Sequence, residues 1–596
     1  MLVLLCWNCA QQGSPAGGPR DEDPPRVVES EPPNYSTRFE AQKILISFDE
    51  YIVLDNVNQE LIVSPPMEEK PEVKLKNKTL VIQFEETLKE NTTYTFNFGS
   101  AIKDLHEGNK LLNFEYVFST GDVLDSLSVK GMLKYAEDLS VPEEPISILL
   151  YEDLRDSVPL LNIPLFVGRS DDSGVFSVNN LRPDTFKIFA LKDGNNNLLF
   201  DLPTEEIAFL DTSLIVNAEF ARLLLAEAGL HDTIMLDTVV KVDMPADSSD
   251  SSEIASDSII ESGPDLNSIY IDMLLFTEET EIQYITDYSR EERRKIQMVF
   301  AKPLTDTFNY RPILSVNETP IDLLEYFSPG RDSLTLWIRD SIDYKKDTLR
   351  MELKFTVKDT TNQFVTRSDT LLFSFREKST KRKKEDPEEQ QPEKLKVSTI
   401  RKGGELDLHR KLPLNLNLPL LAIRDSLISF YHIPDSVEIA EPFQVFPDTL
   451  LLNRGWISAD WESAAQYRMI LYPGAIASIY PLEHDTLDIT FKTRDIEYYG
   501  QILLNLENVG NQVLVQLINK KKVIREREVD ASGLITFSYL VPEDYSIKVI
   551  HDLNGNGKWD TGNYMDKIQP EPVEFLPKSI TVRSNWDHDV TMMLEK

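Results

Sequence analysis

A 29-residue segment of this chain occurs twice without a gap, at positions 359 residues apart. The first copy is Ser173–Asp201 and the second is Ser532–Asp560. Both contain a Ser-Gly step, a Leu-x-Pro-acidic step followed by an aromatic residue, alternating apolar residues and an Asp-x-Asn-x-Asn-x-x-x-Asp loop. Because a duplication copies a folding unit, we expect an array of modules rather than one large catalytic domain.

Length and charge narrow the class of protein. At about 150 residues per domain, a chain of 596 residues is expected to hold roughly four domains, or five if they are small β modules. The net charge is −37, spread along the chain, so the protein should repel nucleic acid and favour cations. No run of 18 apolar residues is present, which predicts no transmembrane helix.

The N-terminus holds both cysteines of the chain, Cys6 and Cys9, and this usage is typical of an oxidising compartment. A short apolar run, a cysteine and a Gly/Pro/Ser/Gln stretch resemble the end of a bacterial lipoprotein signal peptide over residues 1–9. The resemblance implies that Cys9, or alternatively Cys6, carries the lipid and anchors the protein in the outer membrane. Residues 10–25 would be a flexible tether. The apolar segment is short and lacks a basic region, so we expect the true start codon upstream. A chance apolar start on a cytosolic protein is the alternative.

Four short runs of alternating apolar and polar residues predict an antiparallel β-sandwich over residues 26–122. The runs are Lys43–Asp49, Leu80–Phe84, Tyr94–Phe98 and Phe114–Phe118.

An ordered set of motifs in the same region resembles the SbsA-type bacterial Ig-like domain found in lipoproteins of Bacteroidetes. That resemblance implies an extracytoplasmic scaffold without catalytic residues. The motifs are Asp23-Pro-Pro25, Ile44…Phe48-Asp49-Glu50, Leu88…Asn91-Thr-Thr-Tyr94, Ala101-Ile-Lys-Asp104…Gly108-Asn109 and Phe118-Ser-Thr-Gly121.

Each copy of the repeat lies in a second kind of module, at 125–215 and 499–595. In the first, Ser173-Gly-Val-Phe176 and Leu181-Arg-Pro-Asp-Thr-Phe186 resemble the transthyretin-like fold of carboxypeptidase regulatory domains, with Asp184 where glycine is usual. The resemblance implies a second type of β-sandwich.

The remaining segments complete the expected array. We expect a Ser/Asp-rich linker at 244–265, a diverged Ig-like domain at 266–378, a charged linker at 379–395 and a further Ig-like domain at 396–496. The predicted fold class is therefore all-β, with tandem Ig-like β-sandwiches alternating with transthyretin-like β-sandwich modules.

The polar loop at the end of each repeat has the oxygen spacing of calcium loops. In the second copy, side-chain oxygens stand at loop positions 1, 3, 5 and 9, with Gly557 at the sharp turn in position 6. These predicted ligands are Asp552, Asn554, Asn556 and Asp560.

The first copy keeps the four oxygen positions but has Leu198 where glycine is preferred, so its turn should be strained. Its predicted ligands are Asp193, Asn195, Asn197 and Asp201. Neither copy has a glutamate at position 12, where Thr204 and Asn563 stand. The alternative is a plain hairpin tip, for which Asp, Asn and Gly are also favoured. Any Ca²⁺ would be structural.

No catalytic arrangement is visible. The seven histidines do not form a metal-binding spacing, and the nucleophile-elbow, phosphate-loop and dinucleotide motifs are missing. Trp456 and Trp461 would stack on a sugar or, more simply, pack in a core. We expect a non-enzymatic envelope lipoprotein, periplasmic or surface-facing, that acts as a structural or adhesive scaffold for a protein or glycan. The alternative is an accessory, substrate-handling protein for an envelope peptidase, a glycan enzyme or an outer-membrane receptor.

Overall fold

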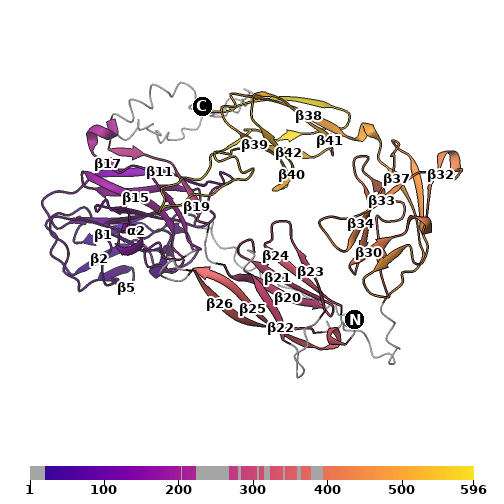
Figure 1. The fold of residues 1–596 in the computed structure, drawn as a ribbon. Helices are drawn as coiled ribbons and strands as arrows, with labels where there is room; N and C mark the ends of the chain where they lie inside the picture. Colours follow the sequence, from indigo (N-terminus) through magenta and orange to yellow (C-terminus); the bar gives the residue numbers. More distant parts are fainter. Residues whose placement is uncertain are drawn as a thin grey trace, which may run out of the picture. The chain divides into compact units, whose positions relative to one another are not determined.

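The computed structural model describes residues 21–202, 204–222, 267–279, 283–304, 308–313, 322–339, 342–358, 364–376 and 394–595. The predicted linkers lie outside these ranges, apart from 394–395. Strands make up nearly all of the regular structure (Figure 1). The chain forms two compact units, of which the N-terminal one comprises residues 1–279 and 559–573 and the C-terminal one 280–558 and 574–596. The predicted all-β fold of tandem sandwiches is confirmed.

The first domain of the N-terminal unit is a β-sandwich whose two main sheets have the orders β1-β2-β6-β5 and β10-β7-β4, with a small sheet β3-β8-β9. Its alternating runs turn one side inward, so that Ile44, Ile46 and Phe48 of one strand are all buried. The elements are β1 (Val27–Glu31), β2 (Lys43–Phe48), β3 (Ile52–Leu54), α1 (Val57–Glu60), β4 (Ile62–Ser64), β5 (Glu72–Lys76), β6 (Thr79–Gln83), β7 (Thr93–Asn97), β8 (Ile102–Asp104), β9 (Lys110–Leu111) and β10 (Glu115–Ser119).

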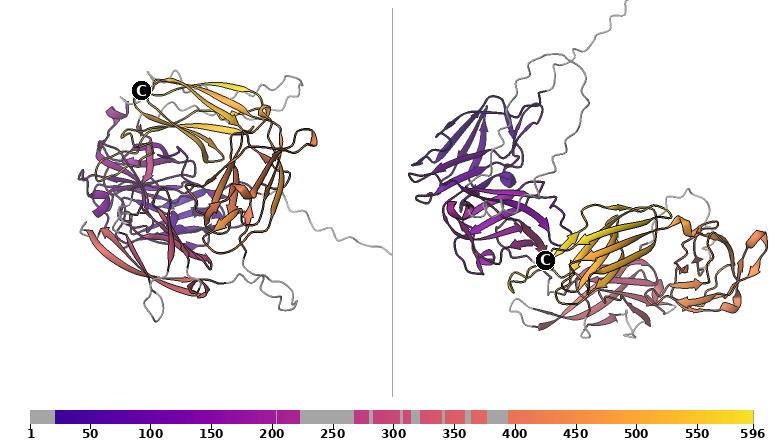
Figure 2. Two further views of the ribbon diagram at one scale, coloured as in Figure 1. Left: turned by 45° about the vertical axis from the view of Figure 1, so that its right-hand side comes forward. Right: turned by 90° about the horizontal axis from the view of Figure 1, so that it is seen from above.

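The second domain is a sheet closed on itself, in the order β12-β13-β14-β11-β19-β16-β15 and back to β12. Its strands β13 and β14 contact β4 and β7 of the first domain, and the right panel of Figure 2 shows the two domains side by side. Its elements are β11 (Leu127–Tyr135), β12 (Ser147–Tyr151), α2 (Val158–Leu161), β13 (Phe166–Ser170), β14 (Val175–Leu181), β15 (Asp184–Lys192), β16 (Glu206–Phe209), β17 (Leu214–Val216), β18 (Ser268–Tyr270) and β19 (Met273–Thr277).

The last two of these strands lie in the segment that the sequence predicts as the third domain, 266–378. Instead β18 and β19 both pair in parallel with β11. The strands on either side of the polar stretch, β17 and β18, therefore both belong to the second domain. Gly131 makes the pairing possible, because a Cβ at this position would lie 1.5 Å from the Ile271 carbonyl oxygen.

The C-terminal unit begins with a third domain, a sandwich of the sheets β20-β21-β24-β23 and β22-β25-β26. Its elements are β20 (Ile285–Glu292), β21 (Lys295–Phe300), β22 (Asn309–Ile313), β23 (Leu323–Phe327), β24 (Ser333–Ile338), η1 (Asp343–Lys345), β25 (Thr348–Lys358) and β26 (Phe364–Ser374).

The fourth domain has the sheets β27-β29-β34-β33 and β28-β37-β35-β31-β32 with a short pair, β30-β36. Its elements are β27 (Val397–Ser398), β28 (Glu405–Leu406), β29 (Leu412–Leu416), β30 (Leu420–Ile423), η2 (Asp425–Leu427), β31 (Ile428–His432), η3 (Pro434–Ser436), β32 (Ile439–Ala440), β33 (Gln444–Pro447), β34 (Arg454–Ser458), β35 (Gln466–Leu471), β36 (Ile476–Ser478) and β37 (Leu487–Thr493).

The fifth domain repeats the strand sequence of the second, as the duplicated segment predicts. Its first strand pairs in parallel with its last, as β11 pairs with β18 and β19. The elements are η4 (Ile496–Tyr498), β38 (Gly500–Glu507), β39 (Val513–Asn519), β40 (Lys522–Val529), β41 (Gly533–Leu540), β42 (Asp544–His551), β43 (Val573–Phe575), β44 (Ile580–Thr581) and β45 (Asp587–Met593).

Within the C-terminal unit the third and fourth domains share packing. Trp337 of the third domain is buried in the core of the fourth. The guanidinium of Arg294 lies 3.6 Å from the Tyr344 ring centroid and 4.2 Å from that of Tyr480. These two domains therefore meet through buried aromatic contacts. Among the residues that the structure describes, no helix has both the length and the apolar character needed to cross a membrane.

Candidate functional site

The first Asp/Asn loop is closed by its own backbone. Asp193 accepts hydrogen bonds from the backbone N–H groups of Asn195, at 3.1 Å, and Leu198, at 2.7 Å. The side chains of Asn195 and Asn197 donate to the two carboxylate oxygens of Asp201, at 3.1 and 2.8 Å. The structure thus brings three of the four predicted ligands into direct contact. Leu198 has φ 60°, so the strained turn predicted at this position is present.

The second loop holds the same turns with glycine in the left-handed positions. Asp552 is buried and accepts from the N–H groups of Gly555, Asn556 and Gly557 at 2.7–3.0 Å. Gly555 and Gly557 have φ 73° and 76°. The boundary between the two compact units falls inside this loop, after Lys558. Of the predicted ligands, Asp560 therefore belongs to the N-terminal unit and the other three to the C-terminal unit.

A buried glutamate binds the backbone at the end of each loop. The sequence did not predict this role. Glu205 accepts from the N–H groups of Gly194, Asp201 and Leu202 at 2.9–3.1 Å. Glu571 accepts from the N–H of Asp560 at 3.0 Å and is likewise buried. In the sequence, Glu205 and Glu571 both stand just before the strand that follows their loop. This strand is β16 in the first copy and β43 in the second.

These loops offer the donor types that Ca²⁺ uses, carboxylate and amide oxygens. In the described residues, however, no three His, Cys, Asp or Glu side chains form a group that would hold a metal ion. Asn195 and Asn197 would have to present their amide oxygens rather than their NH₂ groups toward Asp201. Calcium binding therefore remains a prediction. Cys9, Cys6 and the tether up to residue 20 lie outside the described residues.

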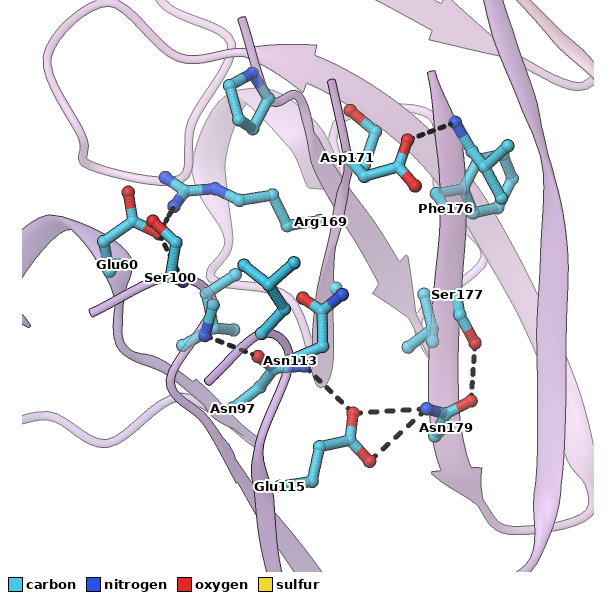
Figure 3. A pocket seen from close by; sticks show the side chains of 18 of the residues that line it. Glu60, Asn97, Ser100, Asn113, Glu115, Arg169, Asp171, Phe176, Ser177 and Asn179 are labelled. Carbon is cyan, nitrogen blue, oxygen red and sulfur yellow. Dashed lines mark hydrogen bonds and ion pairs between the residues drawn. The ribbon is translucent and has the colours of Figure 1, made fainter. Parts of the chain in front are cut away.

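A concavity of the N-terminal unit lies where its first two domains meet, with a volume of about 1030 Å³ (Figure 3). At its centre Glu115 of β10 accepts from Asn97 of β7 at 3.0 Å and from Asn179 of β14 at 3.2 Å. Ser177 donates to Asn179 at 2.6 Å. The hydrogen bonds link strands of both domains, so the floor of the cleft is preorganised.

Arg169 of β13 forms one wall of this cleft. Its guanidinium donates to the Gln59 carbonyl oxygen at 3.0 Å and lies 4.0 Å from the Glu60 carboxylate. Glu60 in turn accepts from the N–H of Ser100 at 3.2 Å. The Nε of Arg169 is buried and has no hydrogen-bond partner in the described part of the chain. This N–H group is therefore an unsatisfied, buried donor at the junction.

The lining of the cleft combines charged, polar and apolar side chains. Among the charged side chains that line it, four are acidic and two basic; these are Glu60, Glu115, Asp171, Asp172, Lys110 and Arg169. Of the other 18 lining residues, nine are serine, threonine or asparagine, seven are apolar and two are glycine. Arg169 also borders a smaller cavity of about 360 Å³, which Asp193 and Leu198 of the first loop help to line. Sequence reasoning missed this site because its residues come from two domains; the hint in the sequence was the Asn179-Asn180 pair in a mainly apolar strand.

The two tryptophans considered as sugar platforms have structural partners. Trp461 packs edge-on against Phe430 and Phe491 and donates to the Arg410 carbonyl oxygen at 3.0 Å. Trp456 donates to Asp448 at 2.9 Å. Trp461 therefore serves the packing of the fourth domain, and the indole N–H of Trp456 is bound within that domain.

Comparison with known proteins identifies one domain. Residues 21–120 match the family described as bacterial Ig-like domain, which is where the sequence predicted such a domain. No curated protein matches the chain.

The solved structures that match this chain have low sequence identity and low TM-scores. The Escherichia coli alpha-2-macroglobulin fragment spanning domains MG0-NIE-MG1 is 10% identical, covers 50% of this chain and 96% of its own, and has a TM-score of 0.18. The S-layer protein rSbsC(31-844) is 9% identical over 94% of this chain and 67% of its own, with a TM-score of 0.13. The major pilin subunit of Bacillus cereus is 8% identical over 79% of this chain and 100% of its own, with a TM-score of 0.15.

Proposed function

We propose that the protein is a non-enzymatic scaffold of the bacterial cell envelope, fastened to the outer membrane by a lipid on Cys9. Support comes from the bacterial Ig-like domain at residues 21–120 and from the array of β-sandwiches that follows it. The observation that carries the proposal is the junction of the first two domains, which is built as a stiff joint.

Short, direct hydrogen bonds hold that joint. The N–H of Val167 donates to the buried hydroxyl of Ser64 at 3.0 Å, and Asn180 donates to Thr95 at 2.9 Å. The connection between the domains is itself pinned, because Asp125 and Thr93 exchange two hydrogen bonds of 2.8 and 3.0 Å. Joints of this kind fix domain orientation, which a scaffold needs and a flexible string of modules lacks.

The test is where the protein lies in the cell. Intact source cells are treated with protease and blotted for the protein, next to a Cys9→Ala variant expressed with its natural upstream sequence. We expect the wild type in the membrane fraction and the variant released from it. Retention of Cys9→Ala in the membrane would remove the lipid anchor from the proposal. Digestion on intact cells would favour adhesion, and protection until the outer membrane is broken would favour a periplasmic scaffold.

Calcium at the first loop is a second part of the proposal, with a structural role in stiffening the tip of the second domain. Saturating Ca²⁺ at about 100 times its Kd would raise the stability of the N-terminal unit by about 2.7 kcal/mol. Asp201→Asn should abolish this increase, whereas Asp138→Asn in another exposed aspartate turn should not. A melting temperature that is the same in EDTA and in Ca²⁺ would refute calcium binding.

A second function, handling a substrate for a partner enzyme or receptor, is favoured by the cleft. Its volume of about 1030 Å³ and the preorganised hydrogen bonds around Glu115 suit a small ligand with polar groups. Glycan and peptide arrays probed with the full chain would test it. A hit that Glu115→Gln removes and Glu69→Gln preserves would support the cleft. A hit that both variants keep would place binding elsewhere.

A further inference from the structure

A segment of the fifth domain packs in the N-terminal unit. Residues Trp559–Val573 belong to that unit, although the chain on both sides of them belongs to the other. Tyr564 lies at the tip of the segment and is only 3% exposed. Its ring meets those of Phe189 and Phe209 edge-on, at centroid distances of 5.2 and 5.1 Å. The segment thus supplies an aromatic side chain to a core that the second domain alone would leave incomplete.

The backbone and hydroxyl of the tip are also bound. The Tyr564 hydroxyl donates to the Asp156 carbonyl oxygen at 2.7 Å, and the Tyr564 N–H donates to the Glu278 carboxylate at 2.6 Å. Burial raises the pKa of both Tyr564 and Glu278, as expected for groups withdrawn from water. A phenylalanine at this position would leave the Asp156 carbonyl without this partner, so the pocket is specific for tyrosine.

Contacts on either side of the tip fix its register. Thr561 donates to the Thr277 carbonyl oxygen at 2.7 Å. Gln569 donates to the Phe209 carbonyl oxygen at 3.1 Å and to the Asp211 carboxylate at 2.8 Å. All of these acceptors lie on or next to β16 and β19, the strands that border the pocket.

An ion pair and a close backbone approach also hold the hairpin in its pocket. Lys567 forms an ion pair of 2.9 Å with Asp156. A Cβ on Gly562 would lie 2.6 Å from the Phe276 ring, so the segment approaches this ring as closely as glycine allows. Buried aromatic anchors surrounded by hydrogen bonds are the features of an interface that carries much binding energy.

The segment is preformed as a small hairpin. Asn563 and Ile568 exchange backbone hydrogen bonds of 2.8 and 2.9 Å. The first copy of the repeat lacks this hairpin, because only three residues separate Asp201 from Glu205 while ten separate Asp560 from Glu571. The fifth domain therefore carries a seven-residue insertion relative to its duplicate.

We propose that Trp559–Val573 is an intramolecular latch, and that the pocket bordered by Phe189, Phe209 and Phe276 is its receptor site. The occupant is this chain's own hairpin, recognised through Tyr564. The latch holds this hairpin in the N-terminal unit, while the chain on both sides of it belongs to the C-terminal unit. The latch is a property beyond the proposed scaffold role, and the experiment that tests the latch does not depend on that role.

The experiment is hydrogen exchange on the full chain, comparing wild type with Tyr564→Ala and with deletion of residues 561–567. The deletion gives the fifth domain the loop length of the second, so that domain should remain folded. Both variants should exchange on the order of 100-fold faster at Trp559–Val573 and at β16, because a buried aromatic anchor is lost. Met565→Ala is the matched control, since its side chain is 57% exposed.

Three results would overturn the latch. The first is unchanged exchange at β16 in both variants. The second is an equal effect of Met565→Ala. The third is protection of Trp559–Val573 that depends on protein concentration, since this would show binding between copies. Exchange at β41 reports whether the fifth domain still folds, and it should match wild type in the deletion variant.

Discussion

Gly131→Ala is the sharpest test of the unexpected strand pairing in the second domain. Gly131 lies where β11 changes partner from β18 to β19. The N–H of Ile271 donates to the Lys130 carbonyl oxygen at 2.9 Å, and Asp272 accepts from the N–H of Met132 at 3.1 Å. An alanine Cβ would lie 1.5 Å from the Ile271 carbonyl oxygen and 2.7 Å from its carbonyl carbon. The returning chain would therefore have to move away from β11.

The chain can accommodate the added Cβ in two ways. Releasing β18 and β19 would expose Ile269, Met273, Leu275 and Phe276, all buried, at about 1.5–3 kcal/mol each, which totals roughly 6–12 kcal/mol. A local shift costs about 1–3 kcal/mol in overpacking, plus about 1 kcal/mol for each of the two hydrogen bonds. The local shift is cheaper, so we expect the strands to stay with a destabilisation of about 3–5 kcal/mol.

The assay is thermal unfolding of the full chain, with hydrogen exchange to assign each transition. At about 2–4 °C per kcal/mol, the N-terminal unit should melt roughly 6–20 °C lower, and exchange should rise first at Ser268–Thr277. Gly533→Ala is the control, because no atom lies within 4 Å of its Cβ position. If Gly131→Ala melted like this control, the pairing of β11 with β18 and β19 would be refuted.

Further predictions concern the repeat and the latch. Gly174 has φ 77° and its Cβ position is 2.7 Å from a carbonyl oxygen of β11, whereas no atom lies near the Cβ position of Gly533. Gly174→Ala should therefore lower the free energy of unfolding by about 2 kcal/mol or more, and Gly533→Ala by less than about 0.5 kcal/mol. Urea unfolding measures both values, and equal losses would contradict the prediction. Hydrogen bonds from Lys187 and Lys567 lower the pKa of Asp156 to about 2 from an ordinary value of 3.8. Its stabilisation should be complete above about pH 4 and be lost as the pH falls toward 2, and Asp156→Asn should remove this part of the pH dependence of urea unfolding; an unchanged pH profile would show that the pair contributes nothing.

The sequence predicted features that depend on local pattern. The alternating runs became β2, β6, β7 and β10 within about one residue of their expected ends. The left-handed turn at Leu198 followed from the position of glycine in the other copy. Periodicity and turn chemistry act over a few residues, so a single sequence shows them.

The missed features all depend on contacts between distant residues. The pairing of β11 with β18 joins residues about 140 positions apart, and a polar stretch of sequence separates them. The cleft needs Glu115 and Asn179 from different domains. The latch joins Tyr564 to Phe189, and its local signal was only a loop length that differs between the two copies. Such contacts leave no pattern in either partner alone.

One pair of equivalent residues indicates that the duplicated unit was larger than the repeat itself. Asn180 and Tyr539 occupy the same repeat position, and both have left-handed backbones, with φ 58° and 54°. Asn180 donates to Thr95 of the preceding domain, and the ring of Tyr539 stacks on His409 of its own preceding domain at 5.8 Å. The backbone thus directs this side chain toward the preceding sandwich in both copies, while the side chain has changed with the neighbour. A position that keeps its geometry and its kind of partner is expected if a sandwich and its following module were copied together. The seven-residue hairpin would then have been added to, or lost from, one copy of an already paired unit.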